Sequence, residues 1–172
     1  MTNRCLYHSN FRDFLNAQPE YILGSLHHAF HGKTLTMTDE AWMGEIILLQ
    51  DVLQPWKDEE ADIIFEYDIP RLGKRIDVVL LLRGMVFCLE FKVGKREALQ
   101  ADVEQVMDYA LDLKYFHLYS QDRFIVPVLI PTSYASSTSL IQPSIYDDQI
   151  YNPLITGAAG LQQLLRLVIE YA

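Results

Sequence analysis

Charged side chains interrupt two apolar segments that have the composition of neighbouring strands. Asp77 lies within the run Ile76–Leu82, and Glu90 and Lys92 lie within the run Met85–Val93. A lone charge in such a strand is costly to bury unless it is paired with another charge or bound to a metal ion. The residue types therefore point either to a shared ligand or to ion pairs in this part of the chain.

The connection between the two segments predicts how their charges meet. Arg83-Gly84 separates the segments, which favours a tight two-residue hairpin turn. Such a turn places Leu82 opposite Met85, so the numbers of opposed residues sum to 167, and Asp77 then faces Glu90. Directly opposed like charges destabilise a sheet. Two carboxylates can instead share a divalent cation, and Mg²⁺ commonly takes one or two carboxylates and keeps several waters.

A lysine accompanies the predicted acidic pair. Side chains alternate along a strand, so Lys92 lies on the same face as Glu90, two residues further on. An ammonium group there can orient a water molecule or hold a phosphate oxygen. The structural alternative is a diagonal salt bridge on an exposed sheet face, joining Asp77 to Lys92 or Glu90 to Arg75. That alternative accounts for the charges but leaves the carboxylates of Asp77 and Glu90 facing each other.

Two predicted helices carry further candidates. Glu45 lies on or beside the inward stripe of a helix predicted from about residue 38 to residue 53. Its carboxylate can complete a metal site or, as a boundary residue, reach solvent, and Glu40 is a weaker substitute. Gln105 and Tyr109 are four residues apart on a helix predicted over 97–116, so they project from one side. A polar flank beside the core is the alternative for that pair.

The remaining pattern predicts an α/β fold with a central mixed sheet flanked by helices. Apolar spacing indicates further helices over 11–30 and 161–171, and strands over 63–67, 75–82, 85–93 and 124–130. Pro127 moves the last strand toward a sheet edge. We expect one domain of residues 1–172, in which 1–34 form an N-terminal helical extension and 131–172 a C-terminal loop and helix.

Composition and charge restrict the class of protein. The 172 residues are 50% hydrophobic and carry a net charge of −9, which fits a soluble globular chain. The apolar run 124–131 is far shorter than the ~20 residues of a membrane span, so no membrane partner is expected. Cys5 and Cys88 make no zinc or disulfide pattern, and a reducing, cytoplasmic location is the expectation. The five histidines do not form a histidine-metal site.

Basic residues are concentrated in one segment of this acidic chain. Residues 71–96 hold seven of the fourteen basic residues and two acids, a local balance of +5, and the rest of the chain carries −14. The net charge argues against broad, non-specific binding of nucleic acid, but a focused positive patch attracts a polyanion locally. A solvated charged face is the alternative interpretation.

Taken together, these residues resemble the PD-(D/E)XK nuclease superfamily. Its helical glutamate, strand aspartate and Glu-x-Lys correspond to Glu45, Asp77 and Glu90-Phe91-Lys92, and Gln105–Tyr109 matches the Q-x-x-x-Y helix motif of the RecB-like branch. The chain is also similar, over roughly residues 35–130, to the N-terminal nuclease-like region of Schlafen group 3-type helicase-like proteins. That similarity rests on three stretches, Tyr67–Asp77, Glu90–Gly94 and Asp108–Lys114.

The resemblance implies a restriction-endonuclease-like core and Mg²⁺- or Mn²⁺-dependent hydrolysis of phosphodiester bonds in DNA or RNA. It implies Asp77 and Glu90 as the main metal ligands, with Glu45 binding directly or through water and Lys92 positioning the nucleophile. Gln105 and Tyr109 would orient nucleic acid or the lysine. The side chains implied to hold backbone phosphates are Arg71, Lys74, Arg75, Lys95 and Arg96.

The resemblance also implies partners. In the helicase-like proteins, the nuclease-like region precedes a P-loop ATPase. No G-x-x-x-x-G-K-[ST] loop occurs in the 172 residues, so the segment is expected to be a stand-alone version or one domain, with an ATPase in cis or in trans. Nucleic acid, with DNA favoured, is the other expected partner. The alternative function is a non-catalytic module that binds nucleic acid or a protein and needs no divalent ion.

Overall fold

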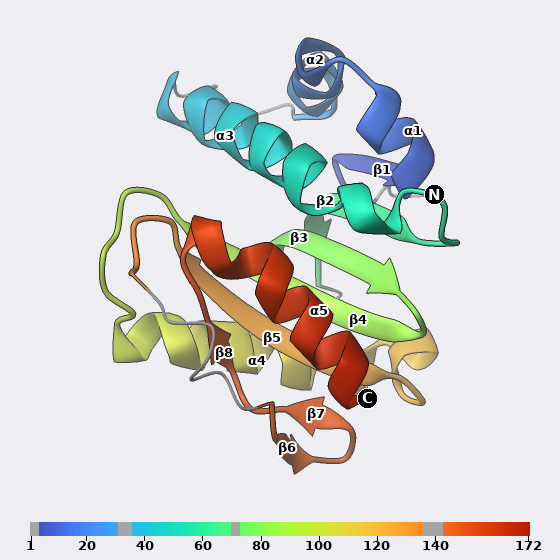
Figure 1. The fold of residues 1–172 in the computed structure, drawn as a ribbon, viewed down its shortest axis with the longest axis vertical. Coiled ribbons are helices and arrows are strands. Elements are labelled where there is room, and N and C mark those ends of the chain that lie inside the picture. Colours follow the sequence, from blue (N-terminus) through green and yellow to red (C-terminus); the bar gives the residue numbers. More distant parts are fainter. Residues whose placement is uncertain (1–3, 31–35, 70–72, 136–142) are drawn as a thin grey trace.

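A mixed β-sheet runs through the molecule, with helices on both of its faces (Figure 1). The structure is a computed structural model that describes residues 4–30, 36–69, 73–135 and 143–172. Its helices are α1 (Phe11–Asn16), α2 (Pro19–Ala29), α3 (Thr36–Val52), α4 (Gln100–Phe116) and α5 (Leu161–Tyr171). Its strands are β1 (Tyr7–Asn10), β2 (Asp62–Asp68), β3 (Arg75–Leu82), β4 (Met85–Lys92), β5 (Phe124–Pro131), β6 (Ile145–Asp147), β7 (Ile150–Tyr151) and β8 (Leu154–Ile155).

The strand order confirms the predicted α/β class with a mixed sheet. Strands β1 to β4 form an antiparallel meander, whereas β4 and β5 pair in parallel. Parallel neighbours need a long crossover connection, and α4 lies in the connection between these two strands. The order across the described sheet is β1-β2-β3-β4-β5-β7-β6, with β8 also paired to β5.

Two apolar cores flank the sheet. The larger core lies between one face of the sheet and the helices α1, α2, α3 and α5. The smaller core lies on the other face, where α4 contributes Tyr109, Ala110 and Leu113. In Figure 1, α5 crosses in front of the strands and α4 lies behind them. No described helix combines the length and apolar character that crossing a bilayer requires.

The hairpin that was predicted to carry the acidic pair is confirmed. Leu82 pairs with Met85 and Val78 pairs with Leu89, so the opposed residue numbers sum to 167 as expected. The two turn residues, Arg83 and Gly84, have φ values of 51° and 74°. Positive φ at both central positions is the geometry of the turn that matches the twist of a two-residue hairpin.

The N-terminal segment departs from the prediction of one helix over 11–30. Two helices are present, and Pro19 occupies the first turn of the second one. Proline favours that position because it has no N–H to donate within a helix. Residues 7–10 form β1, which pairs residue by residue with β2 from Tyr7 with Phe65 to Asn10 with Asp62. The predicted helical extension therefore also supplies a strand to the sheet.

The prediction that Pro127 marks a sheet edge is wrong. Strand β5 is internal, with β4 on one side and β7 and β8 on the other. The N–H of Ile125 donates to the carbonyl of Gln149 at 2.9 Å, and alternation points the nitrogen of Pro127 toward the same side. That side is the gap between β7 and β8, so the missing N–H removes no ladder hydrogen bond. The short strands β6, β7 and β8 were not predicted within 131–172.

Candidate active site

Three carboxylates lie in a row across β2, β3 and β4. The paired residues Phe65 with Val78 and Tyr67 with Ile76 flank Glu66 and Asp77, which therefore lie across from each other on β2 and β3. One step beyond the hairpin pair of Val78 and Leu89, the same count places Asp77 opposite Glu90. The pair of Asp77 and Glu90 lies just beyond the last paired residues of β3 and β4, and the interaction between the two carboxyl groups agrees with the prediction that they meet. Glu66 extends the row by one strand.

Glu66 was not among the sequence candidates. It lies in β2 with a φ of 54°, a conformation that is uncommon for residues other than glycine. Its Oε1 accepts a hydrogen bond of 2.9 Å from Nε1 of Trp42 on α3. Burial raises the pKa of Glu66 to about 7, and the Trp42 hydrogen bond opposes that rise. A polar residue inside the run 62–68 is the same signal that revealed Asp77, and it could have identified Glu66.

Helix α3 carries the fourth carboxylate of the group. Glu45 is only 7% exposed, so the inward orientation is confirmed and the solvent-reaching alternative is wrong. Its Oε2 is buried and has no hydrogen-bond partner. Burial, followed by the negative charge of Asp77, raises the pKa of Glu45 well above its ordinary range. Glu40, the weaker substitute, is exposed on the same helix.

Asp77 is held by the backbone of the neighbouring strand. Its Oδ2 accepts a hydrogen bond of 2.8 Å from the N–H of Phe91. Burial and then the negative charge of Glu90 raise the pKa of Asp77 to about 8, although the Phe91 hydrogen bond and Lys92 oppose the rise. Burial also raises the pKa of Glu90, against the opposing effect of Lys92. The buried carboxylates therefore resist carrying their full negative charge together in the metal-free protein.

Lys92 joins the strand residues to α4. Its Nζ donates to Oε1 of Glu90 at 3.2 Å and to Oε1 of Gln105 at 2.9 Å, and it lies 3.4 Å from Oδ1 of Asp102. The Nε2 of Gln105 in turn donates to the hydroxyl of Tyr109 at 2.7 Å. The structure therefore brings Glu90, Lys92, Gln105 and Tyr109 into one hydrogen-bonded chain, to which it adds Asp102, a residue that the sequence analysis did not select.

Opposing effects fix the protonation of this chain. Burial lowers the pKa of Lys92, but Glu90 and Asp102 raise it by more, so the ammonium form is retained. Burial and the charge of Glu90 raise the pKa of Tyr109 to about 12, so its hydroxyl keeps its proton. The site thus combines a fixed cation with carboxylates that are hard to ionise.

The predicted diagonal salt bridges are replaced by other pairs. Lys92 pairs with Glu90 along its own strand. Arg75 pairs with Asp68 at 2.9 Å and lies 3.9 Å from Glu66. Neither the Lys92–Glu90 pair nor the Arg75 pairs place a basic side chain in a salt bridge with Asp77. The salt-bridge alternative therefore leaves the repulsion among the carboxylates of the row in place.

The residues implied to contact phosphates differ in their availability. Arg71 lies outside the described residues. Arg75 is engaged as above, and Lys74 lies 4.0 Å from Asp108 and 3.6 Å from Asp112. Lys95 and Arg96 are exposed in the loop that follows β4, and neither forms an ion pair with another described residue. Within the described part of the chain, Lys95 and Arg96 can therefore bind a phosphate without first breaking an ion pair with a carboxylate.

The donor set fits a hard divalent cation held by few protein ligands. Oε2 of Glu45 is buried and lacks a partner, whereas Glu90, whose Oε2 is also buried, shares a side-chain hydrogen bond with Asp77. Oxygen donors of this kind suit Mg²⁺ and Mn²⁺. Among the described residues, no group of three or more His, Cys, Asp or Glu is arranged to hold a metal ion. The geometry therefore fits an ion that takes one or two carboxylates and keeps its remaining waters better than a preformed cage of three acids.

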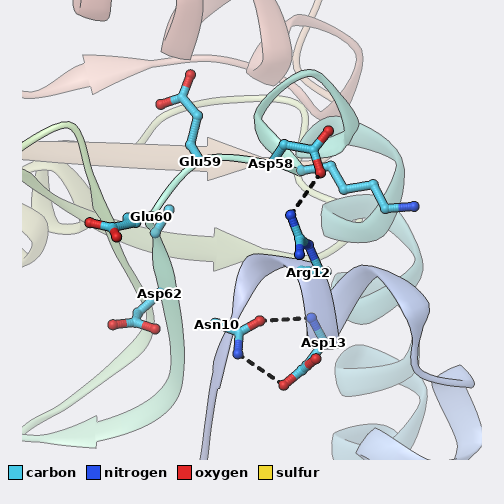
Figure 2. Close-up of a pocket in the computed structure, with 9 residues that line it drawn as sticks. Asn10, Arg12, Asp13, Asp58, Glu59, Glu60 and Asp62 are labelled. Carbon is cyan, nitrogen blue, oxygen red and sulfur yellow. Dashed lines mark hydrogen bonds and ion pairs between the residues drawn. The ribbon is translucent and has the colours of Figure 1, made fainter.

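A larger hollow lies elsewhere, between the start of α1 and the loop before β2. It measures about 590 Å³ and has an acidic rim that includes Asp58, Glu59 and Glu60. Figure 2 shows Arg12 paired with Asp58 across it, and Asn10 bonded to Asp13. Its exposed acids already have partners or reach solvent, and none of its lining atoms is buried without a hydrogen bond. We therefore place the candidate site at the carboxylate row.

Comparison with known proteins does not assign the chain to a family. No protein-family model and no curated protein sequence matches the chain. The resemblance to the PD-(D/E)XK nucleases therefore remains a proposal that rests on the residues and their arrangement.

Proposed function

We propose that the chain is a divalent-metal-dependent nuclease of the PD-(D/E)XK type, RecB-like branch, with a restriction-endonuclease-like core. Its substrate would be DNA, or RNA, and a P-loop ATPase region in cis or in trans would be a partner. One observation carries this proposal: Glu45 keeps a buried, unpartnered carboxylate oxygen close to the buried pair of Asp77 and Glu90, whose carboxyl groups contact each other next to the ammonium of Lys92. Such an arrangement costs stability, and a bound cation would offset that cost.

The residues have distinct roles in this proposal. Asp77 and Glu90 would be the main ligands of Mg²⁺ or Mn²⁺, and Glu45 would bind the ion directly or through water. The ion would neutralise charge on the phosphodiester and lower the pKa of bound water. Lys92 would position the attacking water and stabilise the charge that develops on the phosphate. Gln105 fixes Lys92 through its Oε1 and is itself fixed by the hydroxyl of Tyr109. Lys95 and Arg96 would hold the flanking phosphates.

The second candidate function is a non-catalytic binding module that keeps this fold. One observation favours it: the ammonium of Lys92 already has three acceptors, on Glu90, Gln105 and Asp102. A lysine engaged in this way could serve only to hold β4 against α4. The two candidates differ in their need for a divalent ion.

We expect the purified protein to cleave nucleic acid in the presence of Mn²⁺ or Mg²⁺ and to stop when EDTA is added. Labelled single-stranded DNA, double-stranded DNA and RNA are incubated with each ion, and the products are separated by gel electrophoresis. Asp77→Asn, purified in parallel, controls for contaminating nucleases. If a folded wild-type protein cleaves none of the three substrates with either ion, the nuclease proposal fails and the binding module is the better account.

A further inference from the structure

A small pocket opens beside Glu45, the helical carboxylate of the candidate site. It measures about 220 Å³, which is below the ~300–1,000 Å³ of pockets for drug-sized ligands. Most of its lining is apolar, and the space suits one flat ring system. The lining comes from α3, the end of β4 and the residue after it, the residue that follows β5 and the turn before α5. It includes Ala41, Gly44, Glu45, Leu48, Phe91 and Thr132.

Two residues belong both to this pocket and to the candidate site. Glu45 forms part of the pocket wall, and its charge interacts with those of Asp77 and Glu90. Phe91 lines the pocket, while its backbone N–H holds the carboxylate of Asp77. A phosphodiester bound at the carboxylates would therefore place the adjoining nucleoside at the mouth of this pocket.

Polar groups at the pocket fit the edge of a nucleobase. The hydroxyl oxygen of Thr132 accepts a hydrogen bond of 2.8 Å from the N–H of Gly94, which leaves its O–H proton to donate. The exposed carboxylate of Glu40 can accept from a ring or exocyclic N–H. The apolar walls would contact the faces of the ring, a contact that tolerates any base.

We propose that this pocket binds one unstacked nucleobase next to the scissile phosphate, so that the substrate is single-stranded nucleic acid or a frayed end. The proposal rests on the proposed nuclease function and names its substrate class. A base inside a duplex is stacked and paired, and it enters such a pocket only after extrusion from the helix, which costs the free energy of unstacking and unpairing. A single strand avoids most of that cost.

A glycine provides the variant that tests this pocket. A Cβ built on Gly44 meets no other atom within 4 Å, so Gly44→Leu fills the pocket without a clash near the backbone. Glycine inside a helix is also less favourable than leucine, so α3 should tolerate the change. Gly24 on α2 has the same free space and does not line the pocket, which makes Gly24→Leu the matched control.

The test uses a single-stranded oligonucleotide that contains 2-aminopurine, whose fluorescence reports a change in base stacking. All variants carry Lys92→Met, so that the strand stays largely uncut during the measurement, and Mg²⁺ is present. We expect a saturable fluorescence change for the background protein and for Gly24→Leu, and at least tenfold weaker binding for Gly44→Leu. If Gly44→Leu does not fold, Ala41→Leu fills the same pocket and replaces it. The matching duplex should bind at least tenfold more weakly than the single strand.

Three results would each overturn the proposal. The first is unchanged binding by the pocket-filled variant, the second is no binding by the background protein, and the third is equal binding of the duplex and the single strand. Cleavage assays on the same substitutions, made without Lys92→Met, distinguish failure of the base pocket from failure of the proposed nuclease function. Cleavage that is unaffected by Gly44→Leu would keep the nuclease and remove the base pocket. Binding that is lost in Gly44→Leu, in a protein that never cleaves, would keep the base pocket and remove the nuclease.

Discussion

Replacing Lys92 with methionine should lower metal-dependent cleavage by about 10²–10³-fold, the usual effect of removing one group that stabilises transition-state charge. Methionine keeps most of the length of the side chain but removes the ammonium that contacts Glu90 and Gln105. The loss should appear mainly in kcat, because the developing charge on the phosphate exists only in the transition state. Initial rates over a range of substrate concentrations, with Mn²⁺ present, measure this effect.

Lys57→Met is the matched control for that experiment. Lys57 lines the acidic hollow of Figure 2 and lies outside the proposed site, so its loss should leave kcat within about twofold of the wild-type value. Melting temperatures of both variants verify that they are folded. Full activity in a folded Lys92→Met protein would show that the chemistry does not take place at this lysine.

Asp77→Asn should stabilise the metal-free protein while it removes cleavage. Asparagine retains an oxygen that can accept the hydrogen bond from the N–H of Phe91, but it removes a buried negative charge that faces Glu90. We expect the Tm at pH 8 to rise by about 5 °C or more, since ~1 kcal/mol moves the Tm of a domain of this size by about 2–4 °C. Function and stability would then change in opposite directions, as expected of a site that gives up stability for chemistry.

The pH dependence of that difference follows from the direction of the pKa shift. Asp77 has a folded-state pKa of about 8 against an ordinary value of 3.8. The unfolded chain therefore releases this proton near pH 4, whereas the folded protein holds it until about pH 8. The stability that protonated Asp77 contributes is fully present below pH 3.8 and is lost as the pH rises through 8. The Tm advantage of Asp77→Asn should thus be small at pH 4 and grow up to pH 8.

Asp58→Asn is the control for the loss of a carboxylate that is not buried among other acids. Asp58 is exposed and pairs with Arg12 at 3.1 Å, and exposed pairs contribute only about 0–1 kcal/mol. Its Tm should stay close to that of the wild type, with no growing advantage toward pH 8. If Asp77→Asn instead lowers the Tm substantially at pH 8, the carboxylate of Asp77 is a structural group and the repulsion between the buried acids is not the dominant effect.

The sequence predicts the hairpin of the site well because local rules determine it. Arg83-Gly84 leaves room for a two-residue turn only, and side-chain alternation then sets which residues of β3 and β4 meet. The chain of contacts from Lys92 to Gln105 and Tyr109 could be anticipated only in part. Helical spacing places Gln105 and Tyr109 on one side of α4, but it does not say that this side faces β4.

The features that the sequence did not reveal depend on long-range pairing. The connection between β2 and β3 is longer than a tight turn, so alternation alone could not place Glu66 opposite Asp77. The missing N–H of Pro127 predicts a sheet edge, because the sequence does not show that β7 and β8 leave a gap opposite this residue. Helix α4 starts at Gln100, three residues later than predicted, because the apolar spacing that Val103 and Val106 follow continues back to Leu99, which is extended.

Calorimetric titration with Mn²⁺ tests the central claim most directly, namely that Asp77 and Glu90 bind a divalent ion, with Glu45 as a direct or water-mediated ligand. The wild-type protein should give a saturable binding heat with Mn²⁺ and a weaker one with Mg²⁺, following the usual order of divalent affinities. Asp77→Asn should give neither, and the Tm of the wild type alone should rise with the ion. No binding heat and no change in the Tm of the wild type with either ion would contradict the account.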